Sequence, residues 1–352
     1  MRIVLDNIIF AYQKSGGISV VWGELLRRAL RDGLDLSFID FFPTDNVVRR
    51  ELDLPRDRIR PVPACLRKAV KYLPVPVSGR EPFIFHSSYF RTCPNPRAIN
   101  VTTVHDFTNE WYQTGDGARK ERWIKHNAIR HSDFIICISE HTRRDFFHFF
   151  PDFPEERVYV IHNGVSEDFH PLDDCGALPF PKGSYLLFVG AREGYKRFDI
   201  LPEILGRSGL NLVLTGSPLL GMEGRMLEGF NYHYAGRVST EELNRLYNGA
   251  YALVYPSQYE GFGLPVLEAQ RAGCPVIACN ASSIPEIIGD QALLMERPDP
   301  EEALALIEKL RDPAERAHVI RAGEENARRF SWEKTYQQVM SLYARAMRDG
   351  KL

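Results

Sequence analysis

Residues 250–279 read "AYALVYPSQYEGFGLPVLEAQRAGCPVIAC" and contain a strand, a helix and a second strand in that order. The apolar runs at 250–257 and 275–279 are short and continuous, which is typical of parallel strands buried on both faces. Between them, Pro265 suits the first position of a helix that ends at Gly273. A strand, a crossover helix and a second strand form the repeating unit of a parallel α/β sheet.

The same pattern recurs on both sides of this stretch, over the 352 residues of the chain. The earlier apolar runs are 2–10, 36–42, 83–87, 99–104, 133–139 and 157–164. The later runs are 185–190, 211–216, 232–236, 250–257, 275–279 and 292–295. Residues 170–184 separate the two sets and are rich in Pro, Gly and acidic residues, which indicates a linker.

We therefore predict an α/β protein with two doubly wound, Rossmann-like parallel-sheet domains that face a cleft. The first domain is expected to cover residues 1–171 and the second residues 172–331. An apolar stripe at helical spacing from Trp332 to Ala346 predicts a final helix in residues 332–352. This helix would either return to the first domain or pack on the second.

The composition limits the classes of partner. The formal net charge is −2, so nucleic acid is not an expected partner. Six cysteines without a C-x-x-C pair indicate a reduced, cytoplasmic protein. No apolar run approaches the roughly eighteen residues that cross a bilayer, so we expect a soluble protein that could contact a membrane surface. The composition predicts no oligomeric state.

Residues with functional groups follow several of the predicted strands. Ligands of open parallel sheets bind at the carboxyl ends of the strands. The residues at such positions are Gly16, Gly17, His105, Asp106, Arg192, Lys196 and Glu260. Because they belong to both halves of the chain, we expect one ligand to be held between two domains.

Two segments indicate phosphate binding. Arg192 and Lys196 could neutralise a diphosphate, or could be solvated surface cations. Paired glycines before a helix let the backbone approach a phosphate, although Gly16–Gly17 could equally form a plain turn. The chain has no D-x-D triplet and no H-x-x-x-H, H-E-x-x-H or Walker A pattern. We therefore expect protein groups, without a metal or cofactor, to meet the phosphate charge.

A third phosphate-binding position is expected at the helix that begins with Pro265. Its predicted N-cap, Leu264, has no side-chain acceptor, so the backbone N–H groups of the first turn are available to an anion. Glu260 precedes this helix end and Glu268 lies one turn inside the helix. This separation suits a sugar at one carboxylate and a ribose diol at the other.

The segment "EGFGLPVLE" (260–268) resembles the E-x7-E motif of retaining glycosyltransferases of the GT-B fold, in particular glycosyltransferase family 4. Further motifs occur in the order of that family, and the resemblance covers essentially the whole chain. They are "SGGIS" (15–19), "TVHDF" (103–107), "ICISEHTRRD" (136–145), "VIHNGV" (160–165), "FVGAREGYKRFD" (188–199), "AGRVSTEELNRLYNGAYALVYPS" (235–257) and "EGFGLPVLEAQRAGCPVIACNASSIPEIIGDQALLM" (260–295).

The resemblance implies a role for each matching residue. Glu260 would hold the donor sugar beside the reacting carbon, and Glu268 would bind the ribose hydroxyls. His105 would lie near the transferred sugar and is followed by Asp106; with Glu260 these form the predicted catalytic set. Structural alternatives are a hydrogen-bonded histidine and a helix cap. The implied donor-binding residues are Gly16, Gly17, Arg192, Lys196, Val238, Phe262, Gly263, Leu264 and Glu268.

One departure from the family leaves a choice open. The family often spaces its diphosphate-binding Arg and Lys more widely, and here Arg197 directly follows Lys196. Either Arg192 or Arg197 would therefore be the arginine that binds the diphosphate.

The implied activity is that of a retaining, metal-independent hexosyltransferase. It would move a sugar from a GDP-mannose-like, UDP- or dTDP-sugar donor to a glycan or lipid-linked acceptor in surface polysaccharide assembly, such as that of lipopolysaccharide. The alternatives are a nucleotide-sugar epimerase of the same fold and a non-catalytic nucleotide-sugar-binding protein. Residues 64–73, "ACLRKAVKYL", form a basic amphipathic candidate helix that could rest on anionic lipid or be an ordinary surface helix.

Overall fold

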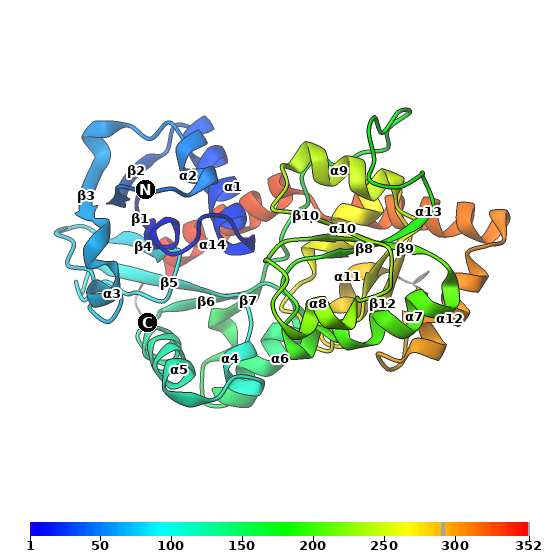
Figure 1. Cartoon of the computed structure of the whole chain (residues 1–352). Coiled ribbons are helices and arrows are strands. Elements are labelled where there is room, and N and C mark those ends of the chain that lie inside the picture. Colours follow the sequence, from blue (N-terminus) through cyan, green and yellow to red (C-terminus); the bar gives the residue numbers. More distant parts are fainter. Residues whose placement is uncertain (290–292, 351–352) are drawn as a thin grey trace. The chain divides into compact units, whose positions relative to one another are not determined.

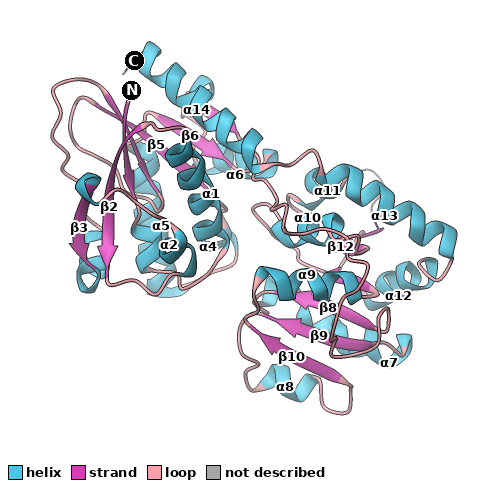
Figure 2. Cartoon of the chain, turned by 90° about the horizontal axis from the view of Figure 1, so that it is seen from above, coloured by secondary structure: helices cyan, strands magenta, loops and turns pink. Residues whose placement is uncertain are grey.

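A computed structural model describes residues 1–289 and 293–350. The chain folds into two compact units, Met1–Gly164 with Trp332–Leu352, and Val165–Ser331. Each unit contains one parallel sheet with helices on its faces (Figure 1, Figure 2). The predicted fold class, two parallel-sheet α/β domains, is confirmed.

The first unit contains a seven-stranded sheet with the order β3-β2-β1-β4-β5-β6-β7. Its strands are β1 (Arg2–Asp6), β2 (Asp35–Phe42), β3 (Ile59–Pro63), β4 (Phe83–Ser87), β5 (Ala98–Val104), β6 (Phe134–Cys137) and β7 (Val158–Val160). Its helices are α1 (Gly17–Arg31), α2 (Val47–Glu51), α3 (Arg67–Val70), α4 (Thr108–Trp111), α5 (Gly115–Arg130), α6 (Glu140–Phe149) and α14 (Trp332–Asp349). The strand order reverses between β1 and β4, so the segments that follow these strands lie at the topological switch point.

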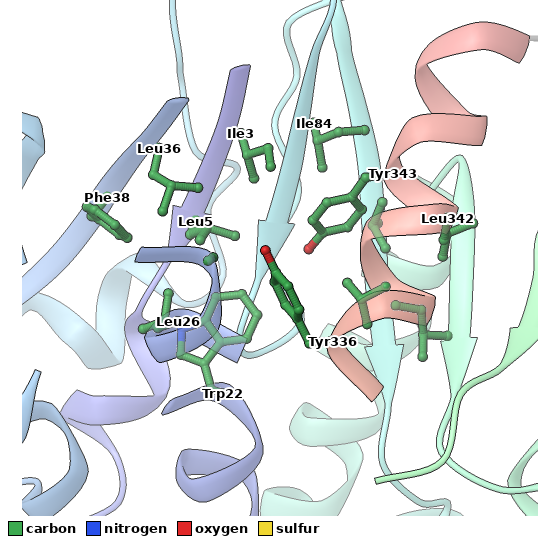
Figure 3. Packing of buried hydrophobic residues seen from close by; sticks show 14 of the residues in the cluster. Ile3, Leu5, Trp22, Leu26, Leu36, Phe38, Ile84, Tyr336, Leu342 and Tyr343 are labelled. Carbon is green, nitrogen blue, oxygen red and sulfur yellow. The ribbon is translucent and has the colours of Figure 1, made fainter. Parts of the chain in front are cut away.

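Apolar side chains on one face of this sheet pack against α1 and α14 (Figure 3). Ile3 and Leu5 of β1 belong to this cluster, whereas Val4 between them belongs to a cluster on the other face. Because successive strand residues point to opposite faces, the continuous apolar run of β1 supplies both layers. The helices contribute Trp22, Leu26, Tyr336, Leu342 and Tyr343 to the first cluster.

The C-terminal helix α14 returns to the first unit. In Figure 1 it lies beside α1, and the two helices are in contact. The Tyr343 hydroxyl lies 2.5 Å from His86 Nδ1 of β4, and the Tyr336 hydroxyl donates to Asp32 at 2.7 Å. Of the two predicted packing arrangements, the structure therefore contains the return to the first unit.

The second unit contains a six-stranded sheet with the order β10-β9-β8-β11-β12-β13. Its strands are β8 (Tyr185–Val189), β9 (Asn211–Thr215), β10 (Tyr232–Gly236), β11 (Ala252–Tyr255), β12 (Val276–Cys279) and β13 (Leu293–Met295). Its helices are α7 (Leu201–Ser208), α8 (Met222–Met226), α9 (Thr240–Gly249), α10 (Leu264–Arg271), α11 (Ile284–Ile288), α12 (Pro300–Lys309) and α13 (Pro313–Ala327). Here the order reverses between β8 and β11. Ala292, the first residue of the last predicted strand, lies outside the described residues.

Short 3-10 turns complete the chain: η1 (Ile8–Ala11), η2 (Arg56–Arg58), η3 (Ala64–Leu66), η4 (Glu155–Arg157), η5 (Gly194–Lys196) and η6 (Phe198–Ile200). The predicted helix at residues 64–73 is thus divided into η3 and the short α3. Among the described residues, no helix is both long and apolar enough to cross a membrane.

The first boundary between the units lies at Gly164, earlier than the predicted boundary after residue 171. The reason is that the intervening segment is bonded to the second unit. Val165 N donates to Phe330 O at 3.3 Å, and His170 N donates to Asn244 Oδ1 at 3.1 Å. The predicted linker therefore begins inside the second unit. The two final residues of the predicted segment 332–352 lie outside the described part of the chain.

Candidate functional site

The carboxyl ends of β8, β9 and β10 meet through glycines. Gly190, Gly216 and Gly236 have φ angles of +109°, +102° and +70°, a region that favours glycine. Gly216 N donates to Gly236 O at 2.7 Å. A Cβ atom on Gly216 would lie only 2.6 Å from Gly190 O. These strand ends therefore touch backbone to backbone.

Lys196 and Glu260 meet at the switch point of the second unit. Lys196 ends the turn η5 after β8, and Glu260 follows the neighbouring strand β11. Lys196 Nζ lies 2.8 Å from Glu260 Oε1, and each side chain is 14% exposed. Such charge-assisted hydrogen bonds are among the stronger ones in proteins. The structure thus joins the predicted phosphate-binding cation to the predicted sugar-binding carboxylate.

Two serines after β12 hold the backbone of the Glu260 segment. Glu260 N donates to Ser282 Oγ at 2.8 Å. The buried Ser283 hydroxyl lies 2.8 Å from Glu260 O and 2.9 Å from Phe262 O. Ser282 has a φ of +54°, which is rare for a residue other than glycine. Sequence reasoning included both serines in a family motif but gave neither a role at the site.

Helix α10 begins one residue earlier than predicted. Its N-cap is Gly263, with a φ of +104°, and Leu264 is its first helical residue. Within the described part of the chain, no side chain hydrogen-bonds as a cap to this helix start. A Cβ atom on Gly263 would lie 2.8 Å from Ile284 Cδ1. The helix ends at Arg271, before the predicted Gly273. In its first turn Pro265 has no N–H group and Val266 N donates to Gly263 O at 3.0 Å, so anion binding at this helix start stays a prediction.

Glu268 lies one turn inside α10, where the Tyr247 hydroxyl donates to its Oε2 at 3.0 Å. Burial raises the pKa of Glu268 to about 7, and the hydrogen bond from Tyr247 opposes this shift. The carboxyl group is therefore divided between its neutral and ionised forms near neutral pH. A small change in pH or in the groups that contact Glu268 will therefore change the charge of its carboxyl group.

The two arginines near Lys196 bind carboxylates of neighbouring segments. Arg192 Nε lies 2.9 Å from Glu223 Oε2, and the side chain of Arg192 is 1% exposed. Arg197 has a φ of +50°, and its Nε and NH2 groups each lie 2.9 Å from an oxygen of Asp199. The structure thus pairs each guanidinium group with a carboxylate other than that of Glu260.

Val238 follows β10 at the same edge of the sheet. It is half-buried and precedes Ser239, the N-cap of α9, whose hydroxyl accepts from Glu242 N at 3.1 Å. The predicted base-contacting residue is therefore held between the end of a strand and a capped helix.

In the first unit, His105 directly follows β5 and lines a narrow cavity of about 40 Å³ together with Trp22, His86 and Tyr336. Burial lowers the pKa of His105 to about 4, Asp106 opposes the shift, and Lys125 adds to it. The imidazole is consequently neutral at physiological pH.

Asp106 is in contact with the start of α4. Its Oδ1 accepts from Thr108 N at 3.1 Å, and its carbonyl oxygen accepts from Lys125 Nζ at 2.9 Å. Its side chain is 41% exposed. The N-cap of α4 is Phe107, so Asp106 accepts this bond from the position before the cap, and its predicted catalytic role stays a prediction.

Gly16 is the N-cap of α1, and Gly17 is the first residue of that helix. Gln13 covers this helix start, because its Oε1 accepts from Ser19 N at 3.2 Å. A Cβ atom on Gly16 would lie 2.7 Å from the same oxygen. Gln13 was not predicted from the sequence, and its capping geometry has no signal in the residue pattern.

Comparisons with known proteins agree with this arrangement. Residues 177–326 match the family described as glycosyl transferases group 1, and residues 15–169 match glycosyltransferase family 4. The O-antigen chain mannosyltransferase B of Escherichia coli is 30% identical over 287 residues, which cover 74% of this chain and 74% of that protein. This chain belongs to the group 1, family 4 glycosyltransferases.

Solved structures show the same fold as this glycosyltransferase. Sucrose-phosphate synthase (tll1590) from Thermosynechococcus elongatus has a TM-score of 0.75 at 18% identity, with 99% of this chain and 100% of that one covered. Alr3699/HepE from Anabaena, in complex with UDP and glucose, has a TM-score of 0.72 at 15% identity, with 97% and 98% covered. At these identities the likeness concerns the fold.

The predicted site residues of this glycosyltransferase fall into two groups. The second unit contains Glu260, Phe262, Gly263, Leu264 and Glu268 on β11–α10, and Arg192, Lys196 and Val238 at the ends of β8 and β10. The first unit contains Gly16, Gly17, His105 and Asp106 after β1 and β5. Over residues 1–289 and 293–350, no group of three His, Cys, Asp or Glu side chains is arranged to hold a metal ion.

Proposed function

We propose that this glycosyltransferase is a retaining, metal-independent hexosyltransferase that uses a nucleoside-diphosphate sugar. The observation that carries the proposal is the Lys196–Glu260 pair beside the start of α10. Lys196 and the N–H groups of α10 would stabilise the negative charge that develops on the departing diphosphate. Glu260 would accept hydrogen bonds from hydroxyls of the sugar.

The proposed reaction takes place on one face of the sugar. The bond between the anomeric carbon and the phosphate oxygen breaks, and a bond from the acceptor oxygen to the same carbon forms on that face. The acceptor hydroxyl gives its proton to the departing phosphate oxygen, so no carboxylate nucleophile is required. His105, neutral because its pKa is about 4, would hydrogen-bond the sugar without adding charge.

For the donor we propose a GDP-mannose-like sugar nucleotide, with UDP- and dTDP-sugars as the competing candidates. Support comes from the relative named O-antigen chain mannosyltransferase B and from relatives named serotype-specific mannosyltransferase WbdA. The proposed acceptor is the hydroxyl of a glycan or lipid-linked saccharide in surface polysaccharide assembly.

The acceptor proposal includes contact with an anionic membrane. Leu66 and Leu73, at the two sides of α3, are 46% and 56% exposed. Tyr72 pairs with the exposed Trp123 of α5 at a ring distance of 6.3 Å. Exposed Trp, Tyr and Leu side chains beside cations such as Lys68 suit a lipid interface. We expect the protein to float with phosphatidylglycerol vesicles in a salt-sensitive way and not to float with phosphatidylcholine vesicles. Equal flotation with both kinds of vesicle would refute the membrane contact.

The direct test of the site compares Glu260→Gln with Glu301→Gln. Glu301 forms an exposed ion pair with Arg207 and serves as the matched control. Loss of a group that stabilises the transition state costs about 100-fold or more in turnover, whereas the control should stay within about twofold of the unchanged protein. Activity should persist in EDTA. Normal turnover of Glu260→Gln would refute the assignment.

A further inference from the structure

The arginine nearest to the end of β8 has an environment unlike that of Lys196. We propose that Arg192 is a positioning residue that fixes the loop after β9, and hence the nucleoside end of the donor site. Lys196 is then the cation of this segment that meets the diphosphate. The inference rests on the proposed function. It implies that neither Arg192 nor Arg197 binds the diphosphate.

The donors of Arg192 are already used inside the protein. Nε binds the Glu223 carboxylate at 2.9 Å, and NH2 donates to the carbonyl oxygens of Ser217 and Pro218, the latter at 2.8 Å. The guanidinium carbon lies 5.8 Å from the centre of the Phe198 ring. Binding a diphosphate would leave these partners unpaired at a side chain that is 1% exposed, which is costly.

These contacts join Arg192 to one loop. The loop begins at Gly216, whose backbone is bonded to the end of β10 through Gly236. It continues to α8, where Glu223 Oε2 also accepts from Leu220 N at 3.1 Å. Arg192 therefore holds both ends of residues 217–223 against the ends of β8 and β9. The next strand end along the sheet carries Val238, the residue proposed for the nucleoside base.

Arg197 is not a substitute for Arg192 at the diphosphate. Its left-handed backbone and its two hydrogen bonds to Asp199 direct its guanidinium to the start of η6 and α7. Lys196 differs from both arginines, because its carboxylate partner is Glu260, which belongs to the proposed sugar-binding group. A bound sugar diphosphate would meet Lys196 and Glu260 together.

Titration calorimetry on the full chain tests the inference. It distinguishes an equal loss of affinity for the nucleoside diphosphate and monophosphate from a loss confined to the diphosphate. The probes are three pairs, GDP with GMP, UDP with UMP, and dTDP with dTMP, and the pair used is the one that the unchanged protein binds. Removing a hydrogen bond to a charged group weakens binding by about tenfold or more. We expect Arg192→Met, Arg192→Lys and Glu223→Gln each to weaken the diphosphate and the monophosphate by the same factor. Lys196→Met should weaken the diphosphate selectively.

Direct binding of the diphosphate by Arg192 predicts different results. Arg192→Lys would then recover much of the affinity because it keeps the charge, and Glu223→Gln would leave affinity unchanged or raise it by releasing the arginine. Either result overturns the inference. Arg207→Met, which breaks a surface ion pair in the same unit, is the control and should bind as the unchanged protein does.

Thermal midpoints, together with the affinities of the unchanged protein, keep the outcomes distinct. Thermal midpoints of all variants identify any that fail to fold. If the Arg192 variants do not fold, the conservative Glu223→Gln variant tests the inference. If the unchanged protein binds none of the three nucleotide pairs, the proposed function fails. If it binds one pair but Arg192→Met loses only the additional affinity for the diphosphate, the positioning role alone fails.

Discussion

Glu268 is the residue of the site whose charge is most sensitive to pH. Its pKa is about 7 in the folded protein because of burial, against 4.5 for an exposed glutamate. Between these values the folded state holds a proton that the unfolded state has released. Stability from this group therefore falls as pH rises from about 4.5 to 7, by at most about 1.4 kcal/mol per pH unit.

This predicts a pH-dependent difference between the unchanged protein and Glu268→Gln. The thermal midpoint of the unchanged protein relative to that of the variant should fall between pH 5 and pH 8, because glutamine does not titrate. Thermal unfolding at closely spaced pH values measures this difference. A constant difference over the range would show that Glu268 titrates at its ordinary pKa.

Gly263 gives a second prediction for a single residue. Alanine at this position would adopt a φ of +104° and place Cβ 2.8 Å from Ile284 Cδ1. Gly209, which ends α7 with a φ of +71° and nothing within 4 Å of an added Cβ, is the matched control. Gly209→Ala should cost about 1–2 kcal/mol of stability, and Gly263→Ala more. Equal midpoints would show that the close approach to Ile284 is not important.

Part of the site could be predicted at the scale of residues, and part could not. Lys196 and Glu260 were expected at one edge of a sheet because each follows a parallel strand, and they lie 2.8 Å apart. The partner of Arg192 was not predictable, because Glu223 lies in α8, a helix of five residues that is too short to show a periodic apolar pattern. Ser282 and Ser283 were missed for a related reason: their contacts depend on the turn after β12.

At the scale of elements, helix α14 shows how a pattern predicts a helix but not its partner. Its apolar stripe predicted the helix, yet the stripe would fit either unit. The choice depends on side chains such as Tyr343, which is fully buried against β4 and contacts His86. The start of α10 shows a smaller limit. Pro265 indicated the helix, but the N-cap is Gly263. Its left-handed backbone has no distinct signal in the sequence, because Gly261, two residues earlier, is equally free to adopt such a conformation.

The helix gives a prediction about two tyrosines. Tyr343→Phe removes the partner of His86 Nδ1 inside the core, which should cost about 1–3 kcal/mol. Tyr336→Phe removes a hydrogen bond to Asp32, a more exposed partner, and should cost less. Thermal midpoints of the two variants provide the comparison. A larger loss for Tyr336→Phe would contradict the packing described for α14.

At the scale of the whole molecule, the sequence indicated two α/β units and the return of the C-terminal helix as one of two arrangements. The first boundary was predicted too late because the Pro- and Gly-rich composition of residues 170–184 resembles a linker. Hydrogen bonds from His170 and Leu172, inside this segment, tie it to the second unit. Val165 also forms a bridge with Ser331, so the two places where the chain leaves the second unit are adjacent.

The central claim is that this chain transfers a hexosyl group with retention, from a nucleoside diphosphate bound at Lys196 and Glu260. The most direct measurement is the anomeric configuration of the new glycosidic bond, read by proton NMR after transfer from an α-linked GDP-mannose, UDP-glucose or dTDP-glucose donor to a mannoside acceptor. The account predicts an α-linked product that is lost in Glu260→Gln. A β-linked product would contradict it.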